Sequence, residues 1–569
     1  MANLELAEIF REIAEILEIQ GENPFKVRAY YRVVQVLENL PEEIDEIYKR
    51  GELRKIPGVG EHIAQKIEEY VRTGKLGYYE HIKKNIPQGL LKILEIPEVG
   101  PKTVKLLYEK LGIDTLAKLK KAIKEKKIRD LPGMGEKSEE NIKKGLEFLS
   151  RKGKRLLLGN AHPLAMAIIE SLKKLHVVER ISPAGSLRRM QETIGDIDIL
   201  VTSRAPSVVM KTFIELPMVT KVLSHGETKS SVIMEEKLQV DLRVVEPDSF
   251  GAALQYFTGS KAHNIKLREM ANEKGYKINE YGLFRIKDNK RVAGREEEEI
   301  YKALGLEYIP PEIREDRGEI EASQHKKLPH LIEGKDIKGD LHLHSNWSDG
   351  HDSIEAMARA AMELGYEYIG LTDHSRSLKV ARGLSISEVK EQLEEVKALN
   401  HKLKGIKILA GCEVDILGKG ELDYPDEILV LYDFVVASIH TGFKQEKAIL
   451  TERIIKTMHH PEINIIAHPT GRLLEKREPY ALDLEAVFKE AKATETYLEL
   501  NAYPERLDLS DIYLRHMKEL GLKVVLGSDA HSTIQLKLMT YGLAMARRGW
   551  LEKGDVLNTL TADELLKLF

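Results

Sequence analysis

From residue 337 to residue 569, short apolar runs alternate with amphipathic segments, and each run ends at or beside a histidine or carboxylate. These runs are DLHLHS (340–345), IGLTDHS (369–375), LAGCEVD (409–415), VVASIH (435–440), NIIAHPTG (464–471) and VVLGSDAH (524–531). Segments such as SISEVKEQLEEVKALNHKL (385–403) lie between them. Strand, loop and helix alternating about seven times predicts an α/β barrel, with a site where the carboxyl ends of its strands meet.

The histidine content of this region favours a metal site. Its 233 residues hold 11 of the 19 histidines in the chain. One buried histidine is more often a satisfied core residue than a ligand, but six histidines and three carboxylates at one barrel end are not explained that way. The HxH spacing puts His342 and His344 on one strand face. Because Cys412 is the only cysteine, any metal is held by imidazole and carboxylate, which suit Zn²⁺, Mn²⁺ or Fe²⁺.

The motifs DLHLHSNWSDG, LTDHS, CEVD, SIH, AHP and SDAH resemble the polymerase-and-histidinol-phosphatase (PHP) superfamily over residues 337–569. The resemblance implies three divalent metals, with Glu413 bridging two of them. Its implied ligands are His342, His344, Asp349, His374, Glu413, His440, His468, Asp529 and His531. An aspartate at position 349, where some relatives have histidine, slightly favours Mn²⁺. Because every ligand position is filled, we expect an active site for metal-assisted phosphoester hydrolysis, which needs no nucleophilic side chain.

The chain is too long for a single core. Its 569 residues suggest three or four domains of about 150 residues each. No apolar run reaches the roughly 20 residues that cross a bilayer, and the N-terminus reads as an amphipathic acidic helix rather than a signal peptide. We therefore expect a cytoplasmic protein without a membrane partner.

Three short repeats near the N-terminus indicate contact with a phosphate backbone. IPGVG (56–60), IPEVG (96–100) and LPGMG (131–135) each lie between helical stretches, and residues 101–160 carry 17 basic against 8 acidic residues although the net charge is −4. The second glycine is expected in a conformation costly for other residues, and the next helix points free N–H groups outward. One copy could be a structural connection, but three resemble helix-hairpin-helix clamps, which hold the DNA backbone without reading sequence and can use a monovalent cation. The predicted DNA contacts are Gly58, Gly60, Val99, Gly100, Gly133 and Gly135.

A second cluster of carboxylates is predicted between residues 183 and 245. In GDIDILV, Asp196 and Asp198 leave the same face of a strand, and LQVDLRVV (238–245) offers Asp241 in a similar alternating context. Like charges on one face repel each other unless a cation lies between them, so neighbouring strands with three carboxylates predict a pair of Mg²⁺ (or Mn²⁺) ions. A lone DxD is common at strand edges. The upstream GSLRR favours a functional site, because Gly185 and Ser186 can wrap a phosphate while Arg189 pairs with it.

GSLRR, GDIDIL, VDLRVV and LQYFTGSKAHNIKLREMANEKGYKINEYGLF (254–284) look like a family X DNA polymerase of the DNA polymerase β type, over residues 1 to about 315. The resemblance implies that Asp196 and Asp198 hold both metals and that Asp241 completes the site where the primer 3′-hydroxyl is activated. It also implies that Ser186 and Arg189 hold the nucleotide phosphates. The other implied contacts are Tyr256, Phe257 and Gly259 at the incoming sugar, Asn264 at the minor-groove edge of the incoming base and Arg268 at the template.

Several positions leave alternatives open. Gln239 replaces an arginine of the animal enzymes, and Lys261 and His263 alter the nucleotide-binding helix, so nucleotide affinity and sugar discrimination are not carried over. Lys66 matches the family's Schiff-base lysine for removing a 5′-deoxyribose phosphate, but a lysine on a charged helix is usually solvated, and His62 stands where a phosphate-binding lysine would help. Arg472, in AHPTGR, is either an anion contact or a structural arginine.

These features predict a multidomain chain with α-helical helix-hairpin-helix domains, an α+β nucleotidyltransferase palm with a thumb, and a distorted seven-stranded α/β barrel of the PHP type. The stretch RGEIEASQHKKLPHLIEGKDI is polar with weak periodicity, so it is expected to be a linker. The predicted domains are 1–85 (lyase-like), 86–152 (fingers), 153–247 (palm), 248–315 (thumb), 316–336 (linker) and 337–569 (PHP).

The order of the domains favours DNA as the common substrate. A histidinol phosphatase needs only the barrel, so a barrel joined to DNA clamps and a palm more plausibly trims DNA. We expect a monomeric repair enzyme that fills short gaps in gapped or nicked DNA from deoxynucleoside triphosphates and resects 3′ ends as a 3′→5′ exonuclease. The resemblance adds 3′-phosphatase and abasic-site cleavage activities. Two alternatives remain open: a small-molecule phosphatase tethered to DNA, and a DNA-binding scaffold whose palm is inert.

Overall fold

The computed structural model describes residues 2–38, 44–56, 58–94, 96, 99–136, 138–140, 142, 143, 146, 155–235 and 238–569. The chain forms two compact units, residues 1–153 with 475–477 and residues 154–474 with 478–569. The predicted boundary between residues 152 and 153 lies outside the described residues. Among the residues described, none of the helices has the length and apolar character needed to cross a membrane.

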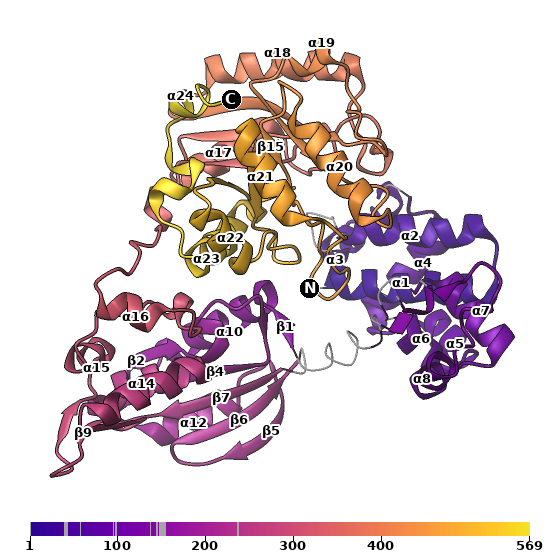
Figure 1. The fold of residues 1–569 in the computed structure, drawn as a ribbon. Helices are drawn as coiled ribbons and strands as arrows, with labels where there is room; N and C mark the ends of the chain where they lie inside the picture. The colour runs from indigo at the N-terminus through magenta and orange to yellow at the C-terminus, as the bar shows by residue number, and fades with distance from the viewer. Residues whose placement is uncertain are drawn as a thin grey trace. The chain divides into compact units, whose positions relative to one another are not determined.

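The first unit is built of short helices around two hydrophobic clusters (Figure 1). Its helices are α1 (Ala2–Gln20), α2 (Pro24–Glu38), α3 (Ile44–Lys49), α4 (Glu61–Thr73), α5 (Gly77–Lys84), α6 (Gln88–Leu94), α7 (Pro101–Leu111) and α8 (Leu116–Lys124). One cluster gathers apolar residues between Leu6 and Ile86, and the other mainly those between Leu90 and Leu146. Two small helical cores are what two successive helix-hairpin-helix domains require.

The glycines of the repeats do not have the conformations that the sequence predicts. Gly60 and Gly100, the second glycines, are extended N-caps of α4 and α7, a conformation open to any residue. The first glycines carry the left-handed backbone, with φ of 82° at Gly58 and 75° at Gly133. The prediction was therefore wrong about which glycine adopts the left-handed backbone conformation that disfavours other residues. The helix expected after residue 135 is helical at its described residues, and its remaining residues lie outside the described part of the chain.

The palm is a five-stranded sheet of order β2-β4-β7-β6-β5, with helices packed against it (Figure 1). Its strands are β2 (Val178–Pro183), β4 (Asp196–Ser203), β5 (Val219–His225), β6 (Lys229–Met234) and β7 (Gln239–Val244), and its helices are α10 (Leu158–Lys173), α11 (Gly185–Arg188) and α12 (Pro206–Ile214). Short strands β1 (Leu156–Leu157) and β3 (Thr193–Ile194) pair separately. Strands β4 and β7 are parallel, and their register places Asp198 opposite Asp241.

The thumb joins helices to a small antiparallel sheet of order β10-β9-β8. Its elements are α13 (Phe250–Thr258), α14 (Lys261–Glu273), β8 (Tyr276–Asn279), β9 (Gly282–Arg285), β10 (Arg291–Ala293) and α15 (Glu297–Ala303). His263 is fully buried in it, hydrogen-bonded to Glu319 at 2.7 Å and to the Tyr301 hydroxyl at 3.0 Å. His263 is therefore a core residue of α14 in the thumb, where its ring is held by Glu319 and Tyr301.

Residues 316–336 are folded, in contrast to the polar linker that the sequence predicts. Helix α16 (Glu319–Gln324) lies within them, and Ile320 packs into the thumb cluster. Glu319 is buried, and its carboxylate is satisfied there because it accepts hydrogen bonds from the amides of Asp316 and Arg317 in addition to its contact with His263. The weak hydrophobic periodicity of this segment did not indicate its fold, because the segment is held by polar contacts to residues distant in the sequence, such as His263 and Asp511.

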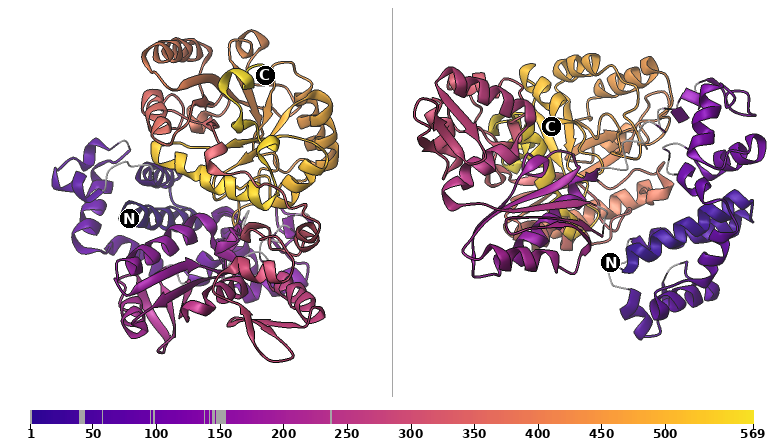
Figure 2. Two further views of the ribbon diagram at one scale, coloured as in Figure 1. Left: turned by 90° about the vertical axis from the view of Figure 1, so that its left-hand side faces the viewer. Right: turned by 90° about the horizontal axis from the view of Figure 1, so that it is seen from below.

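The barrel has seven parallel strands in sequential order, surrounded by helices (Figure 2). Its strands are β11 (Gly339–Leu343), β12 (Tyr368–Leu371), β13 (Lys407–Asp415), β14 (Phe434–Ser438), β15 (Ile465–Ile466), β16 (Tyr497–Asn501) and β17 (Val524–Gly527). Its helices are α17 (Ile354–Glu363), α18 (Ile386–Lys402), α19 (Asp426–Leu429), α20 (Lys447–Met458), α21 (Leu484–Thr494), α22 (Asp511–Glu519), α23 (Met539–Arg548) and α24 (Ala562–Leu565). A parallel bridge between Leu343 and Ala530 nearly closes it. The predicted fold class is confirmed.

Candidate metal centres and nucleotide site

The predicted ligands of the barrel converge around the Glu413 carboxylate at the end of β13. Its Oε2 lies 2.9 Å from Nδ1 of His374 and 3.5 Å from Nε2 of His342, and its Oε1 lies 3.0 Å from Nε2 of His468 and 3.4 Å from Nε2 of His440. Only 1% of the Glu413 side chain is exposed. A carboxylate whose two oxygens face different sets of imidazoles has the placement expected of a bridging ligand.

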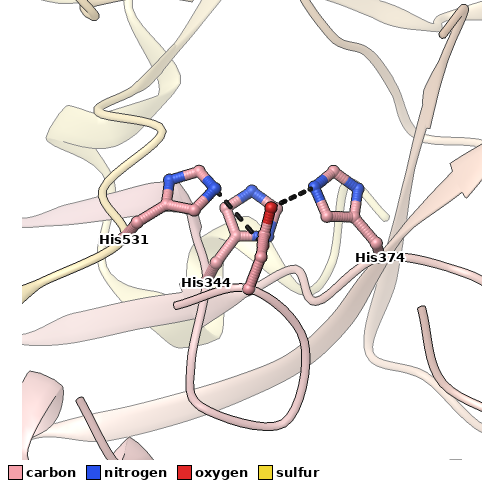
Figure 3. A group of neighbouring side chains, drawn as sticks. His344, His374 and His531 are labelled. Atoms are coloured by element: carbon pink, nitrogen blue, oxygen red, sulfur yellow. Dashed lines mark ion pairs between the residues drawn. The ribbon is translucent and has the colours of Figure 1, made fainter. Parts of the chain in front are cut away.

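Asp349 lies beside the imidazoles of His344, His374 and His531. The rings of His374 and His531 stack on opposite sides of His344, with centroids 4.4 and 4.3 Å away (Figure 3). The Asp349 carboxylate lies 3.3 Å from Nε2 of His531 and 3.6 Å from Nε2 of His374. Three groups have ligand atoms close enough to share a metal: His344, Asp349, His374 and His531; His342, His344 and Asp529; and His374, Glu413 and His440. With His468 on Glu413, the structure brings all nine predicted positions together.

Several partners that orient these ligands were missed by the sequence analysis. Glu499 accepts from Nδ1 of His342 at 2.7 Å, and Asp415 accepts from Nδ1 of His440 at 2.6 Å. Such carboxylates fix the tautomer of a ligating imidazole and increase its basicity. Glu499 and Asp415 lie on β16 and β13, so a carboxylate within an apolar strand was the available signal.

The donors fit a cluster of divalent cations. Among the described side chains, the buried nitrogens Nε2 of His342, both ring nitrogens of His344 and Nδ1 of His374 have no hydrogen-bond partner. Burial lowers the pKa of His344 to about 4, helped by His531 and His374. Burial opposes ionisation of Glu413, but His374, His440 and His342 together lower its pKa well below the usual value. Neutral imidazoles and ionised carboxylates are the forms that bind metals.

The palm cluster consists of carboxylates on two paired strands. Asp198 lies beside Asp196 on β4 and opposite Asp241 on β7, and burial, Asp196 and Asp241 raise the pKa of Asp198 to about 6. Lys229 pairs with Asp241 at 3.1 Å, and Gln239 donates to the same carboxylate at 2.9 Å. Sequence analysis missed Lys229, because only the pairing of β6 with β7 brings it to Asp241. The arrangement concentrates negative charge where two cations can bind.

Among the predicted nucleotide contacts, Gly185 lies beside this cluster. Gly185 has a φ of 62°, and a Cβ there would lie 2.8 Å from the Asp198 carboxylate, so the loop requires glycine. Ser186 follows it in α11, and Arg189 donates to the Thr258 carbonyl and to the Glu315 carboxylate. The remaining predicted residues, Tyr256, Phe257, Gly259 and Asn264, lie at the end of α13 and in α14.

Three of these residues, Asn264, Tyr256 and Phe257, are held by hydrogen bonds or ring contacts. Asn264 donates to the Tyr256 carbonyl at 2.7 Å and accepts from Gln255, and the rings of Tyr256 and Phe257 meet edge to face. Arg268, one turn further along α14, is exposed, and its Nε donates to the Asn264 carbonyl. The hydrogen bond from Asn264 to Tyr256 thus links the predicted base contact in α14 to the predicted sugar contacts in α13.

The clamp glycines and Lys66 lie in the first unit. A Cβ at Gly60, Gly100 or Gly135 would meet nothing within 4 Å, so no contact within the described residues requires glycine there. Val99 is buried, and its backbone N–H donates to the Ile96 carbonyl at 3.0 Å. A pocket of about 560 Å³ is lined by Lys26, Tyr30, Gly58, Gly60, His62, Lys66 and Tyr78, among others. Burial and the nearby Lys26 lower the pKa of Lys66.

Arg472 is not available as an anion contact. Its guanidinium pairs with Glu192 at 2.5 Å and donates to the backbone carbonyls of Arg506 and Leu507. Only 12% of the side chain is exposed. The guanidinium is held by one carboxylate and two backbone carbonyls, so Arg472 has the structural role that the sequence left as the alternative. Arg506, whose Nε lies 3.4 Å from the Asp529 carboxylate, is the arginine nearest the ligands among those described.

Four family models match parts of the chain: a Helix-hairpin-helix domain over residues 1–76, a SAM-like Helix-hairpin-helix tandem over 90–147, the DNA polymerase beta thumb over 253–315 and a PHP domain over 340–503. Together with the two carboxylate and imidazole centres, they define the class of the chain: a DNA polymerase of the β type joined to a PHP metal-dependent phosphoesterase domain.

Comparison with whole proteins identifies the family. The chain is 39% identical to the DNA polymerase/3'-5' exonuclease PolX of Bacillus subtilis (strain 168) over 560 residues, 98% of this chain and 97% of that protein. It therefore belongs to the PolX family of family X DNA polymerases. Two relatives match parts of it: a DNA polymerase lambda of Arabidopsis thaliana, 26% identical over 55% of this chain and 62% of that protein, and a probable phosphatase of Thermoanaerobacter sp. (strain X514), 31% identical over 39% and 89%.

Proposed function

We propose that this chain fills short gaps in DNA by templated nucleotide addition at the palm and shortens 3′ ends with the barrel as a 3′→5′ exonuclease. The observation that supports the proposal is the presence of two separate clusters of ligand-type side chains, carboxylates on β4 and β7 and imidazoles with carboxylates in the barrel, in a chain similar along 98% of its length to a polymerase and exonuclease. Removal of 3′-phosphates and cleavage at abasic sites are proposed as further reactions of the barrel.

In the palm, Asp196 and Asp198 would hold two Mg²⁺ or Mn²⁺ ions, which neutralise the triphosphate and polarise the attacking hydroxyl when bound. Asp241 would accept the proton of the primer 3′-hydroxyl. It lies opposite Asp198, and its two oxygens contact Gln239 and Lys229. Ser186 and Arg189 would bind the nucleotide phosphates. The Arg189 guanidinium is directed by the Thr258 carbonyl, one residue before Gly259 at the proposed sugar site.

In the barrel, the nine ligands would hold three divalent metals, with Mn²⁺ favoured by Asp349 over Zn²⁺ or Fe²⁺. These cations supply an activated water and stabilise charge on the phosphoryl oxygens when bound. The residues of the chain then have two tasks. Glu499 and Asp415 keep His342 and His440 in the metal-binding tautomer, and Arg506 at the rim of the cluster offers a cation to a phosphate.

The helical unit would hold gapped or nicked DNA by its backbone. Gly60, Gly100 and Gly135 leave open space at helix starts, where a phosphate or a monovalent cation can approach N–H groups and carbonyls. Lys66, with its lowered pKa, lies in a pocket with Lys26 and is proposed to form a Schiff base with a 5′-deoxyribose phosphate. We further propose that the protein acts as a monomer in the cytoplasm.

A small-molecule phosphatase activity of the barrel is the second candidate. It is favoured by the similarity to a probable phosphatase, because 39% of this chain matches 89% of that protein. The two candidates differ in substrate: a barrel that hydrolyses phosphate monoesters but no DNA diester would support the phosphatase.

The test uses the full chain with a gapped duplex labelled at the 5′ end of the primer, with and without nucleotides, in Mg²⁺ and in Mn²⁺. We expect extension with nucleotides and shortening without them. Asp196→Ala with Asp198→Ala should remove only extension, and His342→Ala with His344→Ala only shortening. Unchanged incorporation in the first pair would instead support an inert palm and a scaffold role.

A further inference from the structure

Helix α23 of the barrel ends in two neighbouring arginines that both contact the thumb. Arg547 pairs with Glu312 at 2.8 Å and donates to the Ile332 carbonyl. Arg548 is 3% exposed and reaches a different set of groups. The two side chains therefore offer a matched comparison at one surface of contact.

Arg548 touches the proposed nucleotide site by two routes. Its Nη1 donates to the backbone carbonyl of Arg189 at 2.7 Å and to the Glu315 carboxylate at 3.0 Å. The same oxygen of Glu315 accepts from Nε of Arg189 at 3.0 Å. The other side of the Arg548 guanidinium is fixed, because Nη2 donates at 2.7 Å to Asp511 on α22.

We propose that Arg548, a residue of the hydrolase barrel, is a positioning residue for nucleotide binding in the palm, where it shares the Glu315 carboxylate with Arg189. The inference goes beyond the proposed function but rests on it, because Arg189 holds the nucleotide phosphates there. Arg548 makes no contact with a nucleotide and acts through Arg189 and Glu315.

The physical reason is charge sharing on one buried oxygen. A carboxylate bound to two guanidinium groups holds each of them less strongly than a carboxylate bound to one. With Arg548 in place, Glu315 orients Arg189 without neutralising it, so the free N–H groups of Arg189 remain attractive to a phosphate. Without Arg548, the Glu315 carboxylate pairs with Arg189 alone and offsets its positive charge, and the Arg189 carbonyl loses its donor.

Arg548 also belongs to a larger network of charged groups that joins helix α22 of the barrel to Arg189 of the palm. The Asp511 side chain is 9% exposed and pairs with Arg317, in the segment 316–336, as well as with Arg548. Glu315 receives a further hydrogen bond from Gln191. The network thus runs from α22 through Arg548 and Glu315 to Arg189, and each member has a charged or polar partner.

The experiment measures KM for the complementary deoxynucleoside triphosphate and kcat at a one-nucleotide gap, using the full chain. Arg548→Met is expected to raise KM about tenfold with kcat changed less than about threefold, because one charge-assisted contact is lost and the metal ligands remain. Arg547→Met, the matched control, should leave KM within about twofold of the parent. Arg548→Lys keeps a charge near Glu315 and should recover most of the loss, which a purely structural role would not predict.

Glu315→Gln supplies a second line of evidence. If the Glu315 charge offsets Arg189 once Arg548 is gone, adding Glu315→Gln to Arg548→Met should lower KM again. Shortening of the primer without nucleotides reports on folding, and Arg548→Gln replaces Arg548→Met if that activity is lost. Equal KM changes in the Arg547 and Arg548 variants, or no change in either, would overturn the inference while extension by the parent chain still supports the proposed function. A parent chain unable to extend would overturn both.

Discussion

The palm cluster and the barrel cluster solve the problem of binding cations in opposite ways. Asp196, Asp198 and Asp241 bring carboxylates together, and the repulsion among them, added to burial, raises the pKa of Asp198 to about 6. In the barrel, Glu413 is surrounded by imidazoles, and its pKa falls well below the usual value despite complete burial. One cluster is strained by excess negative charge, and the other is stabilised by internal pairing.

This difference predicts how each cluster treats its metals. A partly exposed group of hard oxygen ligands suits Mg²⁺ that arrives with the nucleotide and leaves with the product. A buried group of imidazoles and carboxylates, oriented by Glu499 and Asp415, suits transition metals that stay bound between turnovers. The same chain would then use an exchangeable cofactor for synthesis and a resident one for hydrolysis.

The largest expected effect separates the two clusters directly. Replacing Asp196 and Asp198 by Ala should lower extension by about three orders of magnitude, because metal stabilisation of phosphoryl charge is worth several kcal/mol. Shortening should stay within about twofold of the parent, because no barrel ligand changes. Gel analysis of a labelled gapped duplex measures both. Asp248→Asn, on an exposed residue paired with Arg291, is the control. Loss of shortening in the double variant would contradict the separation.

The reciprocal change is His342→Ala with His344→Ala. These imidazoles bracket Asp529, and His342 also faces Glu413, so their loss should reduce shortening by about three orders of magnitude. Extension should persist. His401→Ala, on the exposed face of α18, is a matched control for a histidine far from the ligands. Metal content by mass spectrometry should fall with activity, and full metal content in an inactive variant would argue against these ligands.

Chelation tests the contrast in metal residence. After brief treatment with a chelator and desalting, Mg²⁺ and nucleotide should restore extension at once, whereas shortening should have survived the treatment. We expect release from the barrel to be at least about a hundredfold slower than from the palm, because its ligands are buried and oriented by further carboxylates. Time courses of residual activity measure this, and equal rates of loss would remove the distinction.

Most barrel ligands could be predicted from sequence because they lie at or just after the end of a short apolar run. His342 lies on β11 and His344 directly after it, and Asp529 and His531 follow β17, so local spacing and the parallel arrangement together place them at one end of the barrel. Glu413 at the centre was equally visible within LAGCEVD. The fold class followed from the same alternation, and the family comparison agrees with it.

Other parts depend on pairing between distant segments, which local patterns do not record. Lys229 reaches Asp241 only because β6 pairs with β7, and His263 is a core residue only because Glu319 folds back onto it. The left-handed conformation at Gly58 instead of Gly60 depends on how the hairpin enters α4. Arg472 was left undecided because its partner Glu192 lies 280 residues earlier.

The pH dependence of extension should sharpen the comparison further. Because the pKa of Asp198 is raised to about 6, this carboxyl is protonated below that pH and must lose a proton to bind a cation. The Mg²⁺ concentration for half-maximal extension should therefore rise about tenfold per pH unit below about 6 and level off above it. Titrations of Mg²⁺ at pH 5.5, 6.5 and 7.5 measure this. A requirement that does not change with pH would show that Asp198 is ionised throughout.

The smallest expected effect tests whether the positively charged Lys229 side chain weakens Mg²⁺ binding at the palm. Lys229 pairs with Asp241 at 3.1 Å and is 43% exposed, so its charge competes with Mg²⁺ but is screened by water. Lys229→Met should lower the Mg²⁺ concentration for half-maximal extension about threefold at pH 7.5, since a screened charge at this distance is worth about 0.5–1 kcal/mol. Lys221→Met, on the exposed strand β5, is the control. Because no comparable lysine pairs with Glu413 among the described residues, shortening should not respond, and a higher Mg²⁺ requirement would mean that Lys229 binds substrate rather than opposing the metal.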